Sequence, residues 1–389
     1  MSPHHAARQP TRPTFGWDNL GGPHRAGLPA VDDLPHRRAL TSGRAALFAA
    51  MKALGVQPGD SVLAPSYHCP TLVAPLRAAG AAVQFYPLGA DGLPRLDAIT
   101  PAPRTRAIVV MQLFGLPRSL AAERAWCDAR GIALVEDCAH SFFGQAGERP
   151  VGHWGDLATA SLSKFFPLAE GGLLASARPL PAQPLRPAGA RQQLKAWVDL
   201  LERGSAQGRL AGLNLPLHAL FRLKNGPSRP PAAGGAPPAS SDMTEAQLLA
   251  DCDLARSEQA PTALARWLAG LPRGRIVARR RAHYEALYRA TQGLRGARPL
   301  CGALPAHAAP YVMPLWVDEP EPAETLYAAL RAAGCAVFRW DRVWPGVPAF
   351  TDDHGARWRR QVLQLLCHQD LDEAQLARSC DVLTRTLTP

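Results

Sequence analysis

The sequence predicts an α/β protein built on a mostly parallel β-sheet that helices cover on both faces. Short apolar segments alternate with helical segments from Thr41 to Glu136. The apolar segments are nearly continuous rather than alternating, which is typical of strands buried on both faces. Several helical segments end at a glycine, the residue that most readily adopts the conformation found just after a helix. This rhythm favours helix-linked parallel strands, whose ligands bind beyond the carboxyl ends of the strands.

Each element of this unit follows from a local pattern. The predicted helices lack internal breakers and are followed by Gly55, Gly80 and Gly131, and Ser119 is the expected cap of the third. The predicted strands are short apolar runs, of which the first ends at Pro65. We expect helices over 44–54, 71–79 and 119–130, and strands over 61–64, 83–86, 107–111 and 132–136.

The rest of the chain divides by composition. Residues 1–40 are rich in Pro, Gly, His and Arg and predict an extended arm. Pro and Gly clusters over 178–241 flank a short helical stretch near 192–201 and indicate a lid or an insertion. We expect a large domain over 41–260 and a small α+β domain over 261–389. The smaller elements are helical segments within 244–294, strands over 311–317 and 336–340, and helices over 323–333 and from Glu373.

Charge and cysteine content narrow the function classes. The chain has 389 residues, 43 Lys and Arg against 32 Asp and Glu, and a formal net charge of +11. The basic residues are scattered and lack a zinc-finger or RNA-binding signature, so a solvated basic surface is favoured over a nucleic-acid partner. We find no secretory signal and no apolar run of membrane-spanning length, and therefore expect no membrane partner. Eight cysteines without a CxxC pair indicate free thiols in a reducing, cytoplasmic compartment.

Two side chains that bear chemistry follow predicted strands. Asp137 comes directly after the segment 132–136, where its carboxylate would reach the ligand crevice, although a turn or capping role is the alternative. Lys164 is one of only four lysines and lies between two serines and two phenylalanines. We expect it to be partly buried, which would lower its pKa and make its amine a better nucleophile. The alternative is a lysine that extends from the sheet edge into water.

A third feature with chemical significance lies at the start of the first predicted helix. Ser42-Gly43-Arg44 opens the first predicted helix, and a helix N-terminus after small residues is a ready phosphate site. A phosphate site, a carboxylate and a partly buried amine are together what pyridoxal phosphate requires of a protein. The amine bonds to the aldehyde, and the carboxylate keeps the pyridine nitrogen protonated.

From Thr41 to Ala177 the sequence resembles the DegT/DnrJ/StrS-type aminotransferases, a family of fold type I pyridoxal-phosphate enzymes. The resemblance implies the fold of that class, with a large and a smaller C-terminal domain. It is looser at Arg279–Arg281 and from Gly334 onward. The matching pieces occur in the family's order: Ser42 through Leu47, Pro58-Gly59-Asp60, Pro65 through His68, Phe114-Gly115, Glu136 through His140, Gly152 with Gly155-Asp156, and Ser163-Lys164 through Glu170-Gly171-Gly172.

The resemblance also implies residue roles. Lys164 would form the Schiff base and carry protons, and Asp137 would pair with the pyridine nitrogen. The remaining cofactor contacts would be Gly43, Arg44 and Ala45 at the phosphate turn, Ser161 or Ser163 as a second phosphate contact, His140 near the ring's phenolic oxygen, and an aromatic ring stacked on the cofactor within Tyr67-His68-Cys69, with His68 favoured.

The sequence departs from the family pattern in two places. Arg44 stands where a threonine is common, which removes a hydroxyl donor. The Asn-Tyr-Arg motif that reaches into a neighbouring subunit is absent, and the Pro/Gly-rich segment 178–241 occupies its place. Near the C-terminus, His368-Gln369 and Arg339-Trp340 are candidates for the substrate side, with a surface role as the alternative.

We therefore expect a homodimeric aminotransferase with ping-pong kinetics. An amino acid, glutamate, would donate the amino group, and a nucleotide-linked keto-sugar would receive it. A cofactor-binding regulatory protein without turnover is the alternative. Two other readings are weaker. A zinc site at His68-Cys69 and Cys138-x-His140 lacks the usual spacing, so we predict no metal. The second weaker reading is a dehydratase of the same family. Those members typically carry histidine at this position, so Lys164 favours transamination.

Overall fold

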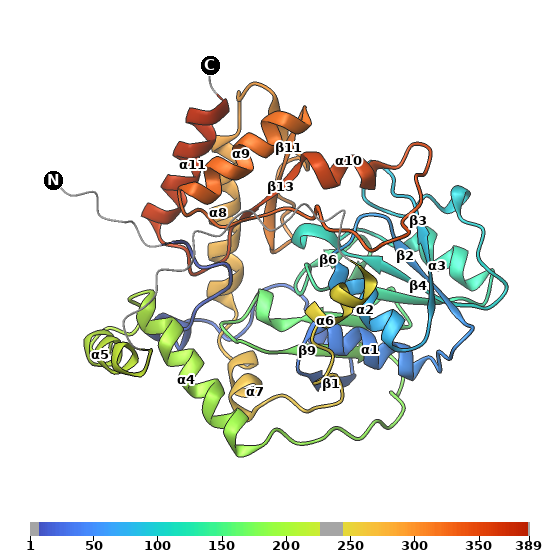
Figure 1. The fold of residues 1–389 in the computed structure, drawn as a ribbon, viewed down its shortest axis with the longest axis horizontal. Helices are drawn as coiled ribbons and strands as arrows, with labels where there is room; N and C mark the ends of the chain where they lie inside the picture. The colour runs from blue at the N-terminus through green and yellow to red at the C-terminus, as the bar shows by residue number, and fades with distance from the viewer. Residues whose placement is uncertain (1–7, 226–243, 388–389) are drawn as a thin grey trace.

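The computed structural model (Figure 1) describes residues 8–225 and 244–387 and contains a seven-stranded sheet. Its strand order is β1-β9-β8-β5-β4-β2-β3. The strands from β8 to β3 are parallel, and β9 and β1 are antiparallel to their neighbours. The expected α/β fold with a mostly parallel sheet is thus confirmed. The bounds are β1 His36–Leu40, β2 Ser61–Pro65, β3 Ala82–Tyr86, β4 Thr105–Met111, β5 Ala133–Asp137, β8 Leu157–Ser161 and β9 Gly172–Ser176.

Strand register brings the chemistry-bearing residues to one edge of this sheet. Asp137 ends β5 and pairs with Met111 of β4 on one side and Thr159 of β8 on the other. Ser161 ends β8 and lies opposite Gly172, where the antiparallel β9 begins. The carboxyl ends of β5 and β8 therefore meet the first residue of β9.

Three helices follow the early strands, and their positions agree closely with the sequence. They are α1 Gly43–Ala53, α2 Pro70–Ala78 and α3 Ala121–Asp128. The expected cap at Ser119 is wrong, because α3 begins two residues later with Leu120 as its N-cap. Ser119 Oγ instead accepts a 3.4 Å bond from Ala121 N and donates to Glu148.

A four-stranded antiparallel sheet lies above the large sheet in Figure 1, in the order β10-β11-β13-β12. The sequence missed β10, β13 and α10. The elements of this region are α8 Gly274–Ala290, β10 Ala297–Pro299, β11 Val312–Val317, α9 Pro320–Ala332, β12 Val337–Phe338, α10 His354–Gln361, β13 Val362–Leu366 and α11 Glu373–Leu387. Short elements complete the chain: β6 Gln145–Ala146, β7 Arg149–Pro150, and 3₁₀ turns η1 Trp17–Asn19, η2 Val31–Asp33, η3 Leu96–Ala98, η4 Leu113–Gly115 and η5 Leu162–Lys164.

The Pro/Gly-rich segment contains more helix than the sequence indicates. Helix α4, Ala190–Ala206, packs against α5, Asn214–Asn225, and against α7, Ala263–Ala269. Helix α6, Glu245–Asp251, packs against α2. The later part of the predicted insertion, residues 226–243, lies outside the described residues.

The N-terminal arm is bonded to the small-sheet region from its first described residues. Gln9 donates to Ser379 Oγ at 3.0 Å and accepts from Ala336 N at 2.7 Å. Thr14 N donates to Asp370 Oδ2 at 3.1 Å. The arm then enters the large sheet as β1, so it links both sheets.

Two sequence expectations concern the chain as a whole. All eight cysteines are free thiols. Among the described residues, no helix combines the length and apolar character needed to cross a membrane.

Candidate active site

A cavity of about 410 Å³ opens at the edge where β5 and β8 end. It receives residues from the large sheet, the small sheet and the N-terminal arm. Its polar and charged lining includes Arg12, Ser42, Arg44, Asp137, His140, Ser161, Ser163, Lys164, Glu170, Asp253, Arg256, Tyr311 and His368. Most of the predicted site residues therefore converge on one space.

Lys164 ends the η5 turn and presents its amine to this cavity. Its Nζ lies 5.2 Å from the centroid of the Tyr311 ring. Burial lowers the pKa of Lys164, and the negative charge of Asp137 partly opposes that effect. A lowered pKa increases the fraction of neutral amine, which is the nucleophilic form.

Asp137 supplies a carboxylate to the same cavity. It is buried, and its Oδ1 accepts bonds from Ala139 N at 3.0 Å and Thr159 Oγ1 at 3.2 Å. Burial raises the pKa of Asp137, while the positive charge of Lys164 and the two donors lower it. Both bonds to the carboxylate reach Oδ1, which leaves Oδ2 available for a ligand.

The neighbouring Glu136 holds the loop that backs the site. It is completely buried and accepts from Gly152 N and Trp154 N at 2.9 Å, Gly155 N at 3.3 Å and Gln112 Nε2 at 3.0 Å. Burial raises the pKa of Glu136, and these four donors oppose the rise. The glycines singled out in the sequence thus supply backbone donors to a buried carboxylate.

The first turn of α1 forms a cradle beside Ser161. A Cβ on Gly43 would lie 3.1 Å from Ser161 Cβ, so the two residues are in close contact. The N–H groups of Gly43 and Arg44 have no acceptor within the helix, as is general for a first turn. Ala45 is different, because its N–H donates to Ser42 Oγ at 3.1 Å and the residue does not line the cavity.

His140 lines the same cavity as Lys164, and its ring packs against two other lining residues. Its ring centroid is 4.4 Å from that of Tyr311 and 4.8 Å from that of Trp340. Its Nδ1 accepts a 3.4 Å bond from Phe114 N. Burial, with a contribution from the Lys164 charge, holds the pKa of His140 well below its usual range. The ring is therefore neutral near pH 7.

The structure does not bring His68 to the cavity, which corrects the stacking role expected of this residue. The ring is completely buried and stacks on Phe85, with 5.2 Å between centroids. Nδ1 donates to Pro65 O at 2.8 Å, and Nε2 accepts from Trp344 N at 3.2 Å. With both nitrogens and one face engaged, His68 is a core residue. Its neighbour Cys69 lines the cavity instead.

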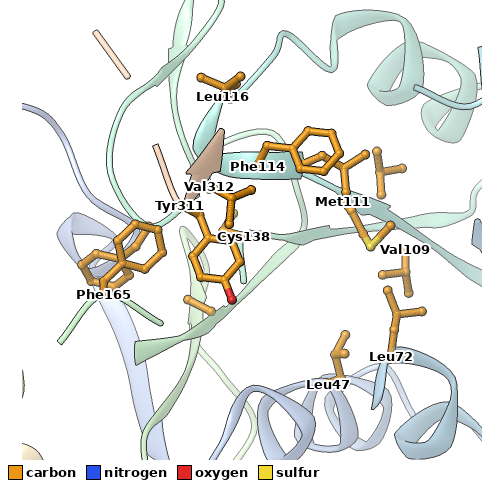
Figure 2. Packing of buried hydrophobic residues seen from close by; sticks show 14 of the residues in the cluster. Leu47, Leu72, Val109, Met111, Phe114, Leu116, Cys138, Phe165, Tyr311 and Val312 are labelled. Carbon is orange, nitrogen blue, oxygen red and sulfur yellow. The ribbon is translucent and has the colours of Figure 1, made fainter. Parts of the chain in front are cut away.

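Tyr311 is a site residue that sequence reasoning missed. Figure 2 shows its ring between Phe165 and Met111, with the hydroxyl directed toward the side where Leu47 and Leu72 lie. Tyr311, Leu47, Leu72 and Met111 all line the cavity. Burial raises the pKa of Tyr311, so its hydroxyl stays protonated and can donate a hydrogen bond.

Arg280 is a second residue that the sequence did not single out by itself. It is completely buried and donates to the Lys164 carbonyl at 2.5 Å and to Gln369 Oε1 at 2.8 Å. Gln369 Nε2 in turn donates to Phe165 O at 2.8 Å. Two side chains from the small-sheet region therefore hold the backbone of the lysine loop. The run Arg279–Arg281 gave no sign that its middle member is buried.

The cavity rim contains one ion pair that reaches the glycine loop. Arg256 binds Glu170 at 2.5 Å, and the other oxygen of Glu170 accepts from Thr262 N at 2.8 Å. Arg256 also accepts a 2.9 Å bond at its carbonyl from Thr41 Oγ1. This network ties the residue before Gly171 to the chain that follows α6.

Only some of the substrate-side candidates near the C-terminus line the cavity. Trp340 and His368 line the cavity, whereas Gln369 acts through the lysine loop. Arg339 pairs with Glu324 and Asp341 and does not line the cavity, which agrees with a surface role.

The cysteine and histidine pairs considered for zinc do not form a ligand set. Within residues 8–225 and 244–387, no group of three or more His, Cys, Asp or Glu side chains is arranged to hold a metal ion. Cys138 is completely buried, and its thiol is directed to Glu136 O at 3.7 Å.

The chain is similar in sequence to known proteins over part of its length. Among curated relatives, a UDP-N-acetyl-3-dehydro-alpha-D-glucosamine 3-aminotransferase of Acidithiobacillus ferrooxidans is 31% identical over 177 residues, which cover 42% of this chain and 46% of the relative. The erythromycin biosynthesis sensory transduction protein EryC1 of Saccharopolyspora erythraea is 34% identical over 185 residues, or 44% of this chain and 49% of the relative. The chain thus matches less than half the length of these relatives.

The fold comparison extends over nearly the whole chain. The crystal structure of the aminotransferase TlmJ from Streptoalloteichus hindustanus has a TM-score of 0.63 at 20% identity and covers 98% of this chain and 99% of its own. At that identity the likeness establishes the fold alone. Residues 33–193 match the profile of the DegT/DnrJ/EryC1/StrS aminotransferase family.

Proposed function

We propose that this protein is a pyridoxal-phosphate-dependent aminotransferase that moves an amino group from glutamate to a nucleotide-linked keto-sugar with ping-pong kinetics. The observation that carries the proposal is the convergence of the Lys164 amine and the Asp137 carboxylate on one cavity. Each lowers the cost of charging the other, as the opposed effects on their pKa values indicate. The proposal includes a Schiff base at Lys164 Nζ, a homodimer and a cytoplasmic location.

The residues present fit the cofactor. The first turn of α1 offers the N–H groups of Gly43 and Arg44 to a phosphate, and Ser161 lies against Gly43 to add a hydroxyl. Ser163 also lines the cavity. The contact between Ser161 and Gly43 favours Ser161 as the second phosphate ligand. When bound, pyridoxal phosphate supplies an aldehyde for the amine and a ring that accepts electrons.

The protein's own groups then have separable tasks. Asp137 Oδ2 would accept the hydrogen bond of a protonated ring nitrogen. Lys164, with its lowered pKa, would take up and return the proton at the reacting carbon. Neutral His140 and protonated Tyr311 would donate hydrogen bonds from the protein side, and the Arg280–Gln369 pair would keep the lysine loop in place.

The substrate class rests on the relatives. Their names include a UDP-N-acetyl-3-dehydro-glucosamine aminotransferase, a 2-deoxy-scyllo-inosose aminotransferase and a dTDP-4-dehydro-2,3,6-trideoxy-D-glucose aminotransferase. Each of these names describes amination of a keto-sugar or a keto-cyclitol. Three arginines at the cavity, Arg12, Arg44 and Arg256, would suit an anionic substrate.

The test is the visible spectrum of the protein with pyridoxal phosphate. We expect an absorption band that glutamate abolishes as the amino group is transferred, and that a keto-sugar nucleotide then restores. Lys195→Ala is a matched control, since Lys195 is exposed and pairs with Asp199 on α4. Lys164→Ala should lose the band and Lys195→Ala should keep it. A wild-type protein that stays colourless with the added cofactor would overturn the proposal.

The same titration separates an enzyme from a regulator. One relative is named a sensory transduction protein, which is the reason to keep that alternative. A regulator without turnover would form the band and bind the cofactor but would not respond to excess glutamate or other amino donors.

A further inference from the structure

We propose that Arg12, on the N-terminal arm, is a substrate-recognition residue that binds the anionic group of a substrate at this site. This inference rests on the proposed function for the identity of the substrates and adds to it the residue that selects their charge. The ligand chemistry is a carboxylate, as on the amino donor, or a phosphate, as on a nucleotide-linked acceptor.

The backbone on both sides of Arg12 is fixed by hydrogen bonds. Pro10 O lies 2.8 Å from His368 Nε2, and Thr14 N donates to Asp370 Oδ2 at 3.1 Å. Thr14 O accepts a 3.0 Å bond from Arg209 Nε. Arg12 therefore sits between two anchored residues of the arm. Holding the backbone in advance reduces the ordering cost when a ligand binds.

The anchors are themselves well supported. Asp370 is almost completely buried and takes ion pairs from Arg209 at 2.8 Å and Arg275 at 2.7 Å. Both ion pairs use Oδ1 of Asp370, so Oδ2 is free to accept the hydrogen bond from Thr14 N. The arm is thus attached to a buried, charge-neutralised cluster rather than to a loose surface loop.

The Arg12 guanidinium has no counter-charge among the described residues. Within the described part of the chain, no carboxylate forms an ion pair with Arg12, while the rim arginine Arg256 is paired with Glu170. Arg12 is exposed and lines the cavity, so a ligand can reach it. A guanidinium in this state can bind a carboxylate or phosphate with two parallel hydrogen bonds.

Arg12 shares its cavity with the Lys164 amine. Arg12, Lys164 and Tyr311 line the same cavity, and the positive charge of Arg12 lowers the pKa values of the other two residues. Gly43 and Ser161, which form the phosphate cradle, lie against each other at the start of α1. Because the helix N-terminus at Gly43 already offers backbone N–H groups to the cofactor phosphate, we assign an anion at Arg12 to a substrate that reacts at Lys164.

The test measures anion binding without turnover. Protein saturated with pyridoxal phosphate is titrated by calorimetry with glutarate, a dicarboxylate that carries no amine, and separately with inorganic pyrophosphate. The variants are Arg12→Gln, Arg12→Lys and the control Arg8→Gln, which removes an exposed arginine of the same arm outside the cavity. A charge-assisted hydrogen bond at an exposed site corresponds to a loss of about tenfold in affinity.

We expect Arg12→Gln to weaken at least one probe about tenfold, Arg12→Lys to weaken it less, and Arg8→Gln to match the wild type. A loss confined to glutarate assigns Arg12 to the donor carboxylate, and a loss confined to pyrophosphate assigns it to the acceptor phosphates. Wild-type affinity of Arg12→Gln for both probes, or no binding of either probe to the wild type, would overturn the inference. The visible band is recorded in the same samples, so failure of the proposed function would be seen separately.

Discussion

Replacing Arg280 by methionine tests whether the small-sheet region holds the loop that carries Lys164. The change removes the guanidinium but keeps an unbranched apolar chain beside the Phe165 ring, whose centroid lies 4.5 Å from Arg280 Cζ. Four acceptors lose a donor: Lys164 O at 2.5 Å, Gln369 Oε1 at 2.8 Å, Pro310 O at 3.0 Å and Tyr311 O at 3.5 Å. Burial lowers the pKa of Arg280 to about 10, so the native charge itself carries a desolvation cost that methionine avoids.

Each acceptor left unpaired in the interior costs ~1–3 kcal/mol. After relief of the desolvation cost, we expect the free energy of unfolding to fall by about 3 kcal/mol. The assay is urea unfolding at pH 7, together with the rate at which glutamate abolishes the visible band. We expect that rate to fall while the band itself still forms, because Lys164 remains present but its backbone is less well held.

The matched control is Arg289→Met, at an exposed position of the same helix α8. It should change the free energy of unfolding by less than about 0.5 kcal/mol. A free energy of unfolding for Arg280→Met within about 1 kcal/mol of the wild type, with an unchanged half-reaction, would refute the reasoning.

Three further predictions concern other parts of the site. Gly172→Ala places a Cβ 1.9 Å from Ser42 O, so we expect a loss of at least about 2 kcal/mol in unfolding free energy and weaker cofactor binding; wild-type values for both would contradict the close approach. Asp137→Asn should keep the visible band but slow its loss with glutamate about 100-fold or more in stopped-flow measurements, and an unchanged rate would remove Asp137 from the mechanism. Burial lowers the pKa of His68 from 6.5 to about 4. The unfolded chain therefore binds the extra proton first as pH falls, and this group should reduce the unfolding free energy by about 3 kcal/mol between pH 7 and pH 4. His68→Gln should show a smaller pH dependence in urea unfolding, and an equal dependence would mean that His68 is not buried neutral.

The sequence predicted the elements whose signals are local. The strands that precede Pro65 and Asp137 are apolar runs buried on both faces, and helix α1 ends just before Gly55, where φ is +66°. Asp137 and Lys164 could be found because residues after parallel strands meet at one edge of the sheet. These inferences need only a short window of sequence.

The residues that were missed depend on contacts between distant segments. Arg280 reads as part of a basic surface run, yet it is buried because Lys164 and Gln369 close over it from segments far away in the chain. Tyr311 and Arg12 reach the cavity only through the packing of the small sheet and the arm. The prediction for His68 was wrong for a different reason. His68 and Cys69 are neighbours in one loop, and only the path of the backbone decides which of the two side chains faces the cavity.

The most direct test of the central claim is to find where the cofactor attaches. Protein incubated with pyridoxal phosphate is reduced with borohydride, digested, and mapped by mass spectrometry. The chain has only four lysines, Lys52, Lys164, Lys195 and Lys224, so the assignment is unambiguous. We predict a phosphopyridoxyl group on Lys164 that no longer forms when glutamate is added before reduction. A protein that carries no label, or a label on another lysine that glutamate does not affect, would contradict the account.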